Sequence, residues 1–350
     1  MSNRIESFAH LAGQTLRTVS YAALYRYTTR EAARLGGELS RVEIAKPAAG
    51  LFTLMQDVLK LQAKDARNVR DGLYPIPVED SVSFASRIEA VRLMLDDLPQ
   101  SAERRADKRA FEAAQLPEAV GLPDYYVQNF HFQSGGWLTD ESAKVYDIQV
   151  ETLFMGAAGA MRRQAIPPIA EFLRGTDQRR LRLIDVACGS GRFLAQLKQA
   201  FPAMPMTGVD LSRAYLDEAA RFLHSRRGVS FQQANAEALP FADASADIVT
   251  CVYLFHELPN EVRRRAAAEI ARVLKPGGLF VFIDSLQWGD VEAYDGLLEA
   301  FPQRFHEPYY LDYCGDALTG ADGLFAQLGL TRADEFPAFL SKIAIFRKAA

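Results

Sequence analysis

The sequence has little of what marks a secreted, membrane-spanning or nucleic-acid-binding protein. Three of its 350 residues are cysteines, Cys188, Cys251 and Cys314, and none belongs to a C-x-x-C pair, which argues against a disulfide framework and a cysteine zinc site. No run of about 18 apolar residues is present, so we expect neither a membrane span nor a signal peptide. The net charge of −4 provides no positive field for nucleic acid. These absences predict a cytoplasmic protein without a nucleic-acid partner.

The composition is that of a folded protein with a large core. Hydrophobic residues make up 49% of the chain and charged residues 24%, which argues against a disordered or low-complexity protein. The length exceeds that of one average domain of about 100–200 residues. We therefore expect two units, over residues 1–120 and residues 121–350.

The first unit is expected to be entirely helical. Apolar residues recur at helical spacing over residues 5–39, 47–70 and 82–98. The third helix is expected to end at Pro99, before a solvated helix over residues 101–115. Two interpretations of this module stay open. It forms a lid, a homodimer interface or part of an acceptor site, or its arginines and aromatic residues make a peripheral contact with a membrane.

The second unit changes to an alternation of strands and helices. After a helix expected over residues 141–161 with Asp140 as its N-cap, short β-branched runs predict strands over residues 181–187, 206–210, 229–233, 248–253, 279–284 and 342–346. Helices are predicted over residues 193–200, 214–225, 261–273 and 316–328. The pattern predicts an α/β fold, with a doubly wound, mostly parallel sheet and helices on both faces. Residues 285–315 form an aromatic insertion.

A glycine-rich turn after the first predicted strand indicates a ligand site. The segment runs Asp185-Val-Ala-Cys-Gly189-Ser-Gly191, and its glycines allow a close approach of the backbone to a ligand. Asp210 ends the next strand, where a carboxylate can bind a ribose. A dinucleotide is disfavoured, because Leu194 occupies the third small-residue position of that fingerprint. The negative charge of Asp185 instead favours a ligand with a positive group.

Several ordered motifs resemble those of class I S-adenosylmethionine-dependent methyltransferases. The similarity is nearest to the small-molecule group that includes quinone-biosynthesis methyltransferases, with a Rossmann-like fold. It covers roughly residues 165–285. The motifs are residues 185–191, Asp210, residues 233–241, 246–249 and 255–258, and the turn and strand at residues 273–280.

The resemblance implies S-adenosyl-L-methionine as cofactor and a set of residues around it. Asp185, Gly189 and Gly191 would face its methionine part. Asp210 would bind the ribose and Leu211 would lie beside the adenine. Asn235, which stands where many relatives carry an aspartate, and Ala236 match the position at the adenine edge. The remaining positions would line or cover the cofactor: Tyr253 after the fourth strand, and Trp137 and Tyr146 in the preceding segment.

The acceptor side is predicted from histidines and aromatic residues. An acceptor that must lose a proton needs a base, and the candidates are His256 with Glu257 and His306 with Glu307. The alternative for each histidine is a structural role in which its ring only forms a hydrogen bond with its neighbours. The aromatic insertion over residues 285–315 is interpreted either as a substrate lid or as a packed cap. A lid of this composition implies an apolar or aromatic small-molecule acceptor. His131, Tyr309 and Tyr310 are the predicted acceptor-binding residues.

Metal binding is not expected, because His131, His256 and His306 lie far apart in the sequence. The predicted function is methyl transfer from S-adenosylmethionine to a small hydrophobic or aromatic acceptor. Two alternatives stay open. One is a protein that binds the cofactor without catalysis, and the other is a methyltransferase that acts on a membrane lipid or quinone.

Overall fold

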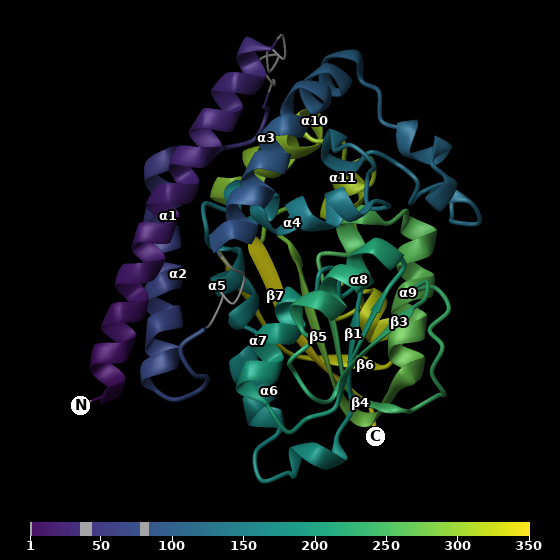
Figure 1. The fold of residues 1–350 in the computed structure, drawn as a ribbon. Helices are drawn as coiled ribbons and strands as arrows, with labels where there is room; N and C mark the ends of the chain where they lie inside the picture. The colour runs from purple at the N-terminus through teal and green to yellow at the C-terminus, as the bar shows by residue number, and fades with distance from the viewer. Residues whose placement is uncertain (1, 36–43, 78–83) are drawn as a thin grey trace.

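A seven-stranded sheet forms the centre of the computed structural model, which describes residues 2–35, 44–77 and 84–350 (Figure 1). The strand order is β3-β2-β1-β4-β5-β7-β6. Strands β1 to β5 pair in parallel, whereas β7 is antiparallel to both β5 and β6. The strands are β1 (Leu183–Val186), β2 (Met206–Asp210), β3 (Val229–Gln233), β4 (Ala246–Val252), β5 (Leu274–Ser285), β6 (Leu330–Ala338) and β7 (Ser341–Lys348).

Helices cover both faces of the sheet, and this confirms the predicted fold class. Successive side chains of a strand point to opposite faces, so Leu183 packs with α6 (Ile166–Phe172), α7 (Arg192–Ala200) and α8 (Arg213–Phe222). Ile184 instead packs in the core beneath α9 (Asn260–Val273) and α12 (Leu324–Gln327). Both cores consist of buried aliphatic and aromatic side chains, which is typical of a sheet covered on two sides.

The end of the chain differs from the prediction. Residues 316–328 contain only the short helix α12, because Gly323 lies tightly against the carbonyls of Ala317 and Leu318 in a turn. The edge strand β6 was not predicted. Its residues are mostly exposed, so it lacks the apolar run by which the other strands are recognised.

Long helices precede the sheet, and no strand lies before β1 among the residues described. They are α1 (Ser2–Arg34), α2 (Leu51–Arg70) and α3 (Phe84–Asp107). The predicted end of the first helix near residue 39 lies outside the described residues. The predicted stop at Pro99 is wrong, because α3 continues through it. The expected separate helix over 101–115 is thus the end of α3 followed by short 3-10 turns, η1 (Glu112–Gln115) and η2 (Pro117–Ala119).

The predicted helix over residues 141–161 is two helices, α4 (Asp140–Leu153) and α5 (Ala158–Arg163). The chain turns between them through Met155 and Gly156, which both have positive φ. A Cβ on Gly156 would lie 3.0 Å from side-chain atoms of α1, so α1 packs closely against this turn. The N-cap of α4 is Thr139 and not Asp140, because the Thr139 hydroxyl accepts the hydrogen bond from the backbone of Ser142.

A buried polar network joins α1, α2 and α5. The Asp65 carboxylate accepts hydrogen bonds from Tyr74 and Arg163 and contacts the His10 ring at 2.6 Å. Because the carboxylate faces the Arg163 guanidinium, its charge is compensated inside the protein. The inner face of α1 therefore packs through polar contacts, with Gln14 and Thr18 also bonded to α2.

Residues 285–315 form a helical cap at the carboxyl end of β5. The cap contains η6 (Glu292–Tyr294), α10 (Asp295–Arg304) and α11 (Tyr310–Gly315), above the sheet in Figure 1. The remaining 3-10 turns are η3 (Phe130–Phe132), η4 (Gln178–Arg180) and η5 (Phe255–Glu257). Since η3, η5 and the cap all lie at the carboxyl-end edge of the sheet, segments distant in sequence meet there.

Candidate active site

A cavity opens at the carboxyl ends of β1, β2 and β4, where ligands of open parallel sheets bind. We call it the strand-end cavity. Eight of the ten residues predicted to bind the cofactor line it: Gly189, Asp210, Leu211, Asn235, Ala236, Tyr253, Trp137 and Tyr146. Asp185 and Gly191 do not.

The turn after β1 shapes the floor of this cavity. Gly189 has φ +52° and a Cβ there would meet no atom within 4 Å, so the backbone is open to a ligand. Its N–H donates to the Asp210 carboxylate at 2.8 Å, and the N–H of Ser212 donates to the other oxygen at 2.9 Å. These bonds fix the Asp210 side chain at the cavity wall, and each oxygen retains a lone pair for a ligand.

Asp185 lies beneath the cavity and not in its wall. Its side chain is buried and accepts a hydrogen bond from the Thr250 hydroxyl at 2.6 Å. Burial disfavours the ionised form and raises the pKa of Asp185 to about 7. The residue therefore carries a partly uncompensated charge that a nearby positive group would stabilise.

Gly191 allows the start of α7 to pack closely against α8. It is the N-cap of α7 with φ +76°, and a Cβ there would approach Ala219 and Leu223 to 3.0 Å. Gly191 does not line the strand-end cavity, and its contact with a cofactor stays a prediction.

Asn235 lines the cavity but its polar atoms are already bonded. Its carbonyl oxygen accepts from the N–H of Glu237 at 2.9 Å, and its amide nitrogen donates to the Glu237 carboxylate at 3.1 Å. Tyr125 donates to the same carboxylate. A contact of the Asn235 side chain with an adenine would have to share these bonds.

Aromatic residues of the connector before α4 cover the cavity. Trp137 stacks on Phe130 with ring centroids 4.1 Å apart, and its carbonyl accepts a hydrogen bond from the Ser212 hydroxyl. Tyr125, Tyr126 and Tyr215 line the cavity as well and were not predicted. The density of aromatic residues in this connector was the signal that could have identified the first two.

Two further cavities continue from the first. The inner cavity, about 130 Å³, shares Trp137, Tyr146, Tyr253 and Glu257 with the strand-end cavity. Cap residues also line it, namely Leu297, Leu298, Phe301 and Tyr310. The outer cavity, about 330 Å³, shares His131, Trp137 and Tyr146 with the inner cavity and reaches residues of α1 and α3: Tyr25, Thr28, Thr29, Ala32, Met94, Asp97, Leu98, Ser101 and Arg105.

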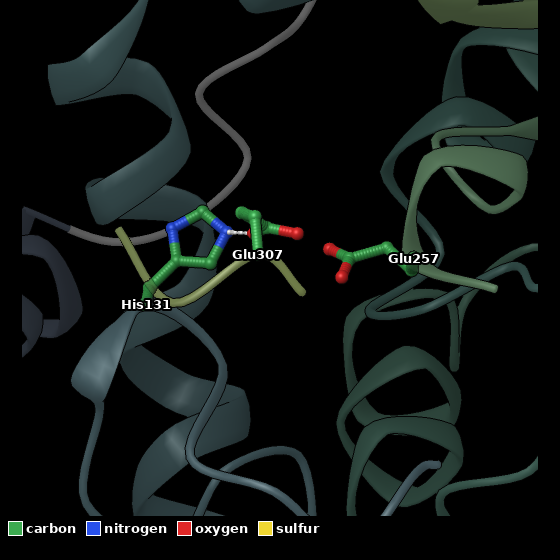
Figure 2. Close-up of side chains that lie close together, drawn as sticks. All are labelled: His131, Glu257 and Glu307. Carbon is green, nitrogen blue, oxygen red and sulfur yellow. Dashed lines mark ion pairs between the residues drawn. The ribbon is translucent and has the colours of Figure 1, made fainter. Parts of the chain in front are cut away.

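Acidic and histidine side chains meet at the inner cavity. We call His131, Glu257 and Glu307 the carboxylate cluster. They come from η3, η5 and the loop between α10 and α11, and Figure 2 shows the two carboxylates facing each other with His131 beyond Glu307. The His131 Nε2 atom lies 2.6 Å from a carboxylate oxygen of Glu307. Burial and the neighbouring Glu307 carboxylate raise the pKa of Glu257 well above its ordinary value.

His256 lies beside this cluster and also lines the inner cavity. Its Nδ1 is 2.5 Å from Asp284 and its Nε2 is 3.4 Å from Glu257. Burial by itself would lower the pKa of His256, but these two carboxylates outweigh it and raise the pKa well above its ordinary value. Both ring nitrogens thus face carboxylates, an arrangement in which His256 can hold Glu257 in place. Its role as a general base stays a prediction.

His306 and Tyr309 lie away from the three cavities. The His306 Nε2 atom is 2.7 Å from the Gln128 side-chain oxygen, and its ring contacts Phe111, Phe130 and Phe132. Tyr309 accepts a hydrogen bond from the Gln128 amide. Neither lines any of these three cavities, so their lining gives no support to a catalytic role for His306 or an acceptor contact for Tyr309, and both roles stay predictions. His131 and Tyr310 do line the inner cavity.

Comparisons with known proteins identify similar chains. Residues 183–278 match the family model described as a methyltransferase domain. The chain is 34% identical over 122 residues to a phthiotriol/phenolphthiotriol dimycocerosates methyltransferase of Mycobacterium tuberculosis, covering 35% of this chain and 44% of that relative. It is 32% identical over 146 residues to a ubiquinone/menaquinone biosynthesis C-methyltransferase of Desulfotalea psychrophila, covering 42% of this chain and 56% of that relative.

One solved structure, the YcgJ protein from Bacillus subtilis, aligns with 49% of this chain and 94% of its own, with 20% identity and a TM-score of 0.38. The chain spans about half the length of the curated relatives it matches. Among the residues that the structure describes, no helix is both long enough and apolar enough to cross a bilayer.

Proposed function

We propose that this chain, which carries a class I S-adenosylmethionine-dependent methyltransferase domain, transfers a methyl group to a small acceptor with a hydrophobic or aromatic body. The observation that carries the proposal is the continuity of the three cavities, because Trp137 and Tyr146 line all of them. A cofactor in the strand-end cavity and an acceptor in the inner cavity would thus meet at shared walls. Methyl transfer needs this alignment of two ligands and the exclusion of water.

The strand-end cavity has the features that the cofactor requires. S-adenosylmethionine, when bound, supplies the methyl group on a positively charged sulfur. The exposed backbone at Gly189 forms the cradle, Asp210 offers carboxylate oxygens to the ribose, and Leu211 and Ala236 provide apolar contacts for the adenine. Asp185 would attract the ammonium of the methionine part from below.

The inner and outer cavities support an elongated apolar acceptor. The inner cavity is lined mainly by apolar and aromatic residues, and the outer cavity extends it toward α1 and α3. An aromatic head group in the inner cavity would place its reactive atom near Glu257, and a hydrocarbon chain could continue past Met94 and Leu98. A quinone or a lipid fits this shape, as the names of the two curated relatives also indicate for those proteins.

The outer face of α1 supports a second copy of this chain as a partner. Ile5, Phe8, Leu16, Val19 and Tyr27 are each more than half exposed. Together with Ala12 and Ala23 they recur at intervals of three, four and four residues, the spacing with which one helix packs along another. Between Phe8 and Tyr25 the histidine, lysine, arginine and acidic positions are His10 and Arg17, and both contact the protein interior. The narrow uncharged stripe favours a helix as its partner over a membrane.

The cofactor proposal is tested by replacing Asp210. The substitution Asp210→Ala removes the proposed ribose contacts, so calorimetry should show S-adenosylmethionine affinity reduced at least about tenfold. Asp217→Ala, an exposed aspartate on the neighbouring helix α8, is the matched control and should bind normally. Equal affinity of Asp210→Ala and wild type would show that the cofactor lies elsewhere.

The acceptor is identified by mass spectrometry of quinone and lipid extracts that have been incubated with enzyme and cofactor. The products should be heavier than the substrates by one methyl group. A protein that binds the cofactor but yields no such product would be non-catalytic.

A further inference from the structure

The carboxylate cluster contains two buried acids, Glu257 and Glu307, that lie side by side, each with one histidine near it. The Glu307 side chain is fully buried, and its two oxygens lack a hydrogen-bond donor of regular geometry among the described residues. One oxygen of Glu257 lacks a donor as well. Two buried carboxylates that face each other repel unless a proton or a cation lies between them. A proton shared by the two acids, or a cation bound between them, would relieve this repulsion.

We propose that His131, Glu257 and Glu307 bind one divalent transition-metal ion. One imidazole nitrogen and two carboxylate oxygens lie within 4.8 Å of one another, close enough to surround a single ion with small shifts of the side chains. Two carboxylates and a neutral imidazole balance the charge of a divalent ion. The nitrogen ligand favours Mn²⁺ or Zn²⁺ over Ca²⁺ and Mg²⁺, which prefer oxygen.

The surroundings support the three ligands. His256 lies 3.4 Å from Glu257 and is itself held by Asp284, an arrangement that orients a ligating carboxylate. His131 has φ +55° and the following Phe132 has φ +58°, a strained backbone that places the imidazole beside Glu307. Strain of this kind is retained where the position of a side chain matters.

The ion would have open positions toward the acceptor. His131 and Glu257 line the inner cavity, whereas protein encloses Glu307 from behind. This step rests on the proposed function: an acceptor that offers a hydroxyl oxygen, or two neighbouring oxygens, would coordinate the ion. Coordination lowers the pKa of a hydroxyl, so the acceptor would release its proton to solvent without a histidine base. Its oxygen would then form the bond to the methyl carbon as the carbon–sulfur bond of the cofactor breaks and S-adenosylhomocysteine leaves.

The metal site is tested without cofactor or acceptor. The full chain, freed of metal with a chelator, is titrated with MnCl₂ by calorimetry and with CoCl₂ by visible absorption. We expect one ion per chain and a Co²⁺ spectrum typical of mixed nitrogen and oxygen ligands. Glu307→Gln should weaken binding at least about tenfold. Glu292→Gln, the same change at an exposed position of the cap, should bind like the wild type.

A second variant keeps the test valid if Glu307→Gln does not fold. His131 is more exposed than the two acids, and His131→Asn should also weaken binding and change the Co²⁺ spectrum. No saturable binding up to millimolar metal, or equal binding by wild type and Glu307→Gln, would overturn the proposal and indicate a shared proton instead. Asp210→Ala should bind the ion normally, so failure of the cofactor proposal and failure of the metal proposal would be distinguished.

Discussion

The burial of Asp185 lowers the stability of the folded protein at neutral pH. Its carboxyl is buried below the strand-end cavity with one hydrogen bond, from Thr250. The burial that raises its pKa to about 7 means that the folded state binds a proton more tightly than the unfolded state does. The contribution of Asp185 to stability is thus present at low pH and lost as the pH rises toward 7.

We expect Asp185→Asn to stabilise the free protein and weaken cofactor binding. The amide removes the buried charge but can still accept the Thr250 hydrogen bond, so unfolding in urea at pH 8 should cost about 1–3 kcal/mol more than for wild type. The difference should shrink at pH 5, where the wild-type carboxyl is protonated. Affinity for S-adenosylmethionine should fall at pH 8. An unchanged free energy of unfolding for Asp185→Asn at pH 8 would show that burial of the wild-type carboxyl does not destabilise the folded protein.

The sequence identifies members of the carboxylate cluster but not how they pair. It predicts pairs of neighbours, His256 with Glu257 and His306 with Glu307. In the structure His131 contacts Glu307 instead, and His306 turns to Gln128. Spacing along the chain could not indicate this, because the three members of the cluster come from three segments that only the completed fold brings together.

Strands and helices could be predicted where a local sequence pattern determines them. The β-branched runs of β2 and β3 predicted their bounds, whereas the exposed β6 gave no such signal. Pro99 predicts a helix stop because proline removes a backbone donor, yet α3 continues through it. A helix can continue past a proline where tertiary packing supports it, and α3 packs against α4.

The network around Asp65 makes the docking of α1, α2 and α5 dependent on pH. Burial by itself would raise the pKa of Asp65, but the Arg163 guanidinium and hydrogen bonds from His10 and Tyr74 hold it well below the usual range. A lowered pKa contributes stability above the ordinary pKa of about 4, and this stability is lost as the pH falls further.

We expect Asp65→Asn to destabilise the protein at pH 7 by about 3–5 kcal/mol, because the buried Arg163 would lose its counter-charge. The difference from wild type, measured by urea unfolding, should narrow between pH 4 and pH 2. Asp71→Asn, at the C-cap of α2, is the matched control. Its ion pair with Arg70 is exposed, so this change should leave the unfolding midpoint unchanged. A small effect of Asp65→Asn at pH 7 would show that solvent reaches the network.

At the scale of the whole molecule, the first half of α1 has polar side chains inward and apolar side chains outward. Its buried face bears His10, Gln14 and Thr18, whereas its exposed stripe is apolar. Large apolar patches on a protein surface mark contacts with a partner. The sequence showed the apolar periodicity of this helix, but it could not show which face the rest of the chain would cover.

We expect the chain to form a dimer through this stripe. Sedimentation velocity should show a dimer for wild type and a monomer for the double variant Leu16→Glu, Val19→Glu, because two charges would be buried at the interface. Ala242→Glu, in an exposed loop before β4, is the control and should remain dimeric. A wild-type monomer that sediments with anionic vesicles would contradict the dimer and assign the stripe to a membrane.

The shared walls of the cavities have a consequence for how acceptor preference can diverge. Trp137, Tyr146 and Tyr253 border both the strand-end cavity and the inner cavity, so a substitution there disturbs two ligands together. Leu297, Leu298 and Phe301 border the inner cavity from α10 without lining the strand-end cavity. New acceptors are therefore most accessible through changes in one short helix, and a library confined to α10 would alter substrate choice while leaving the cofactor site as it is.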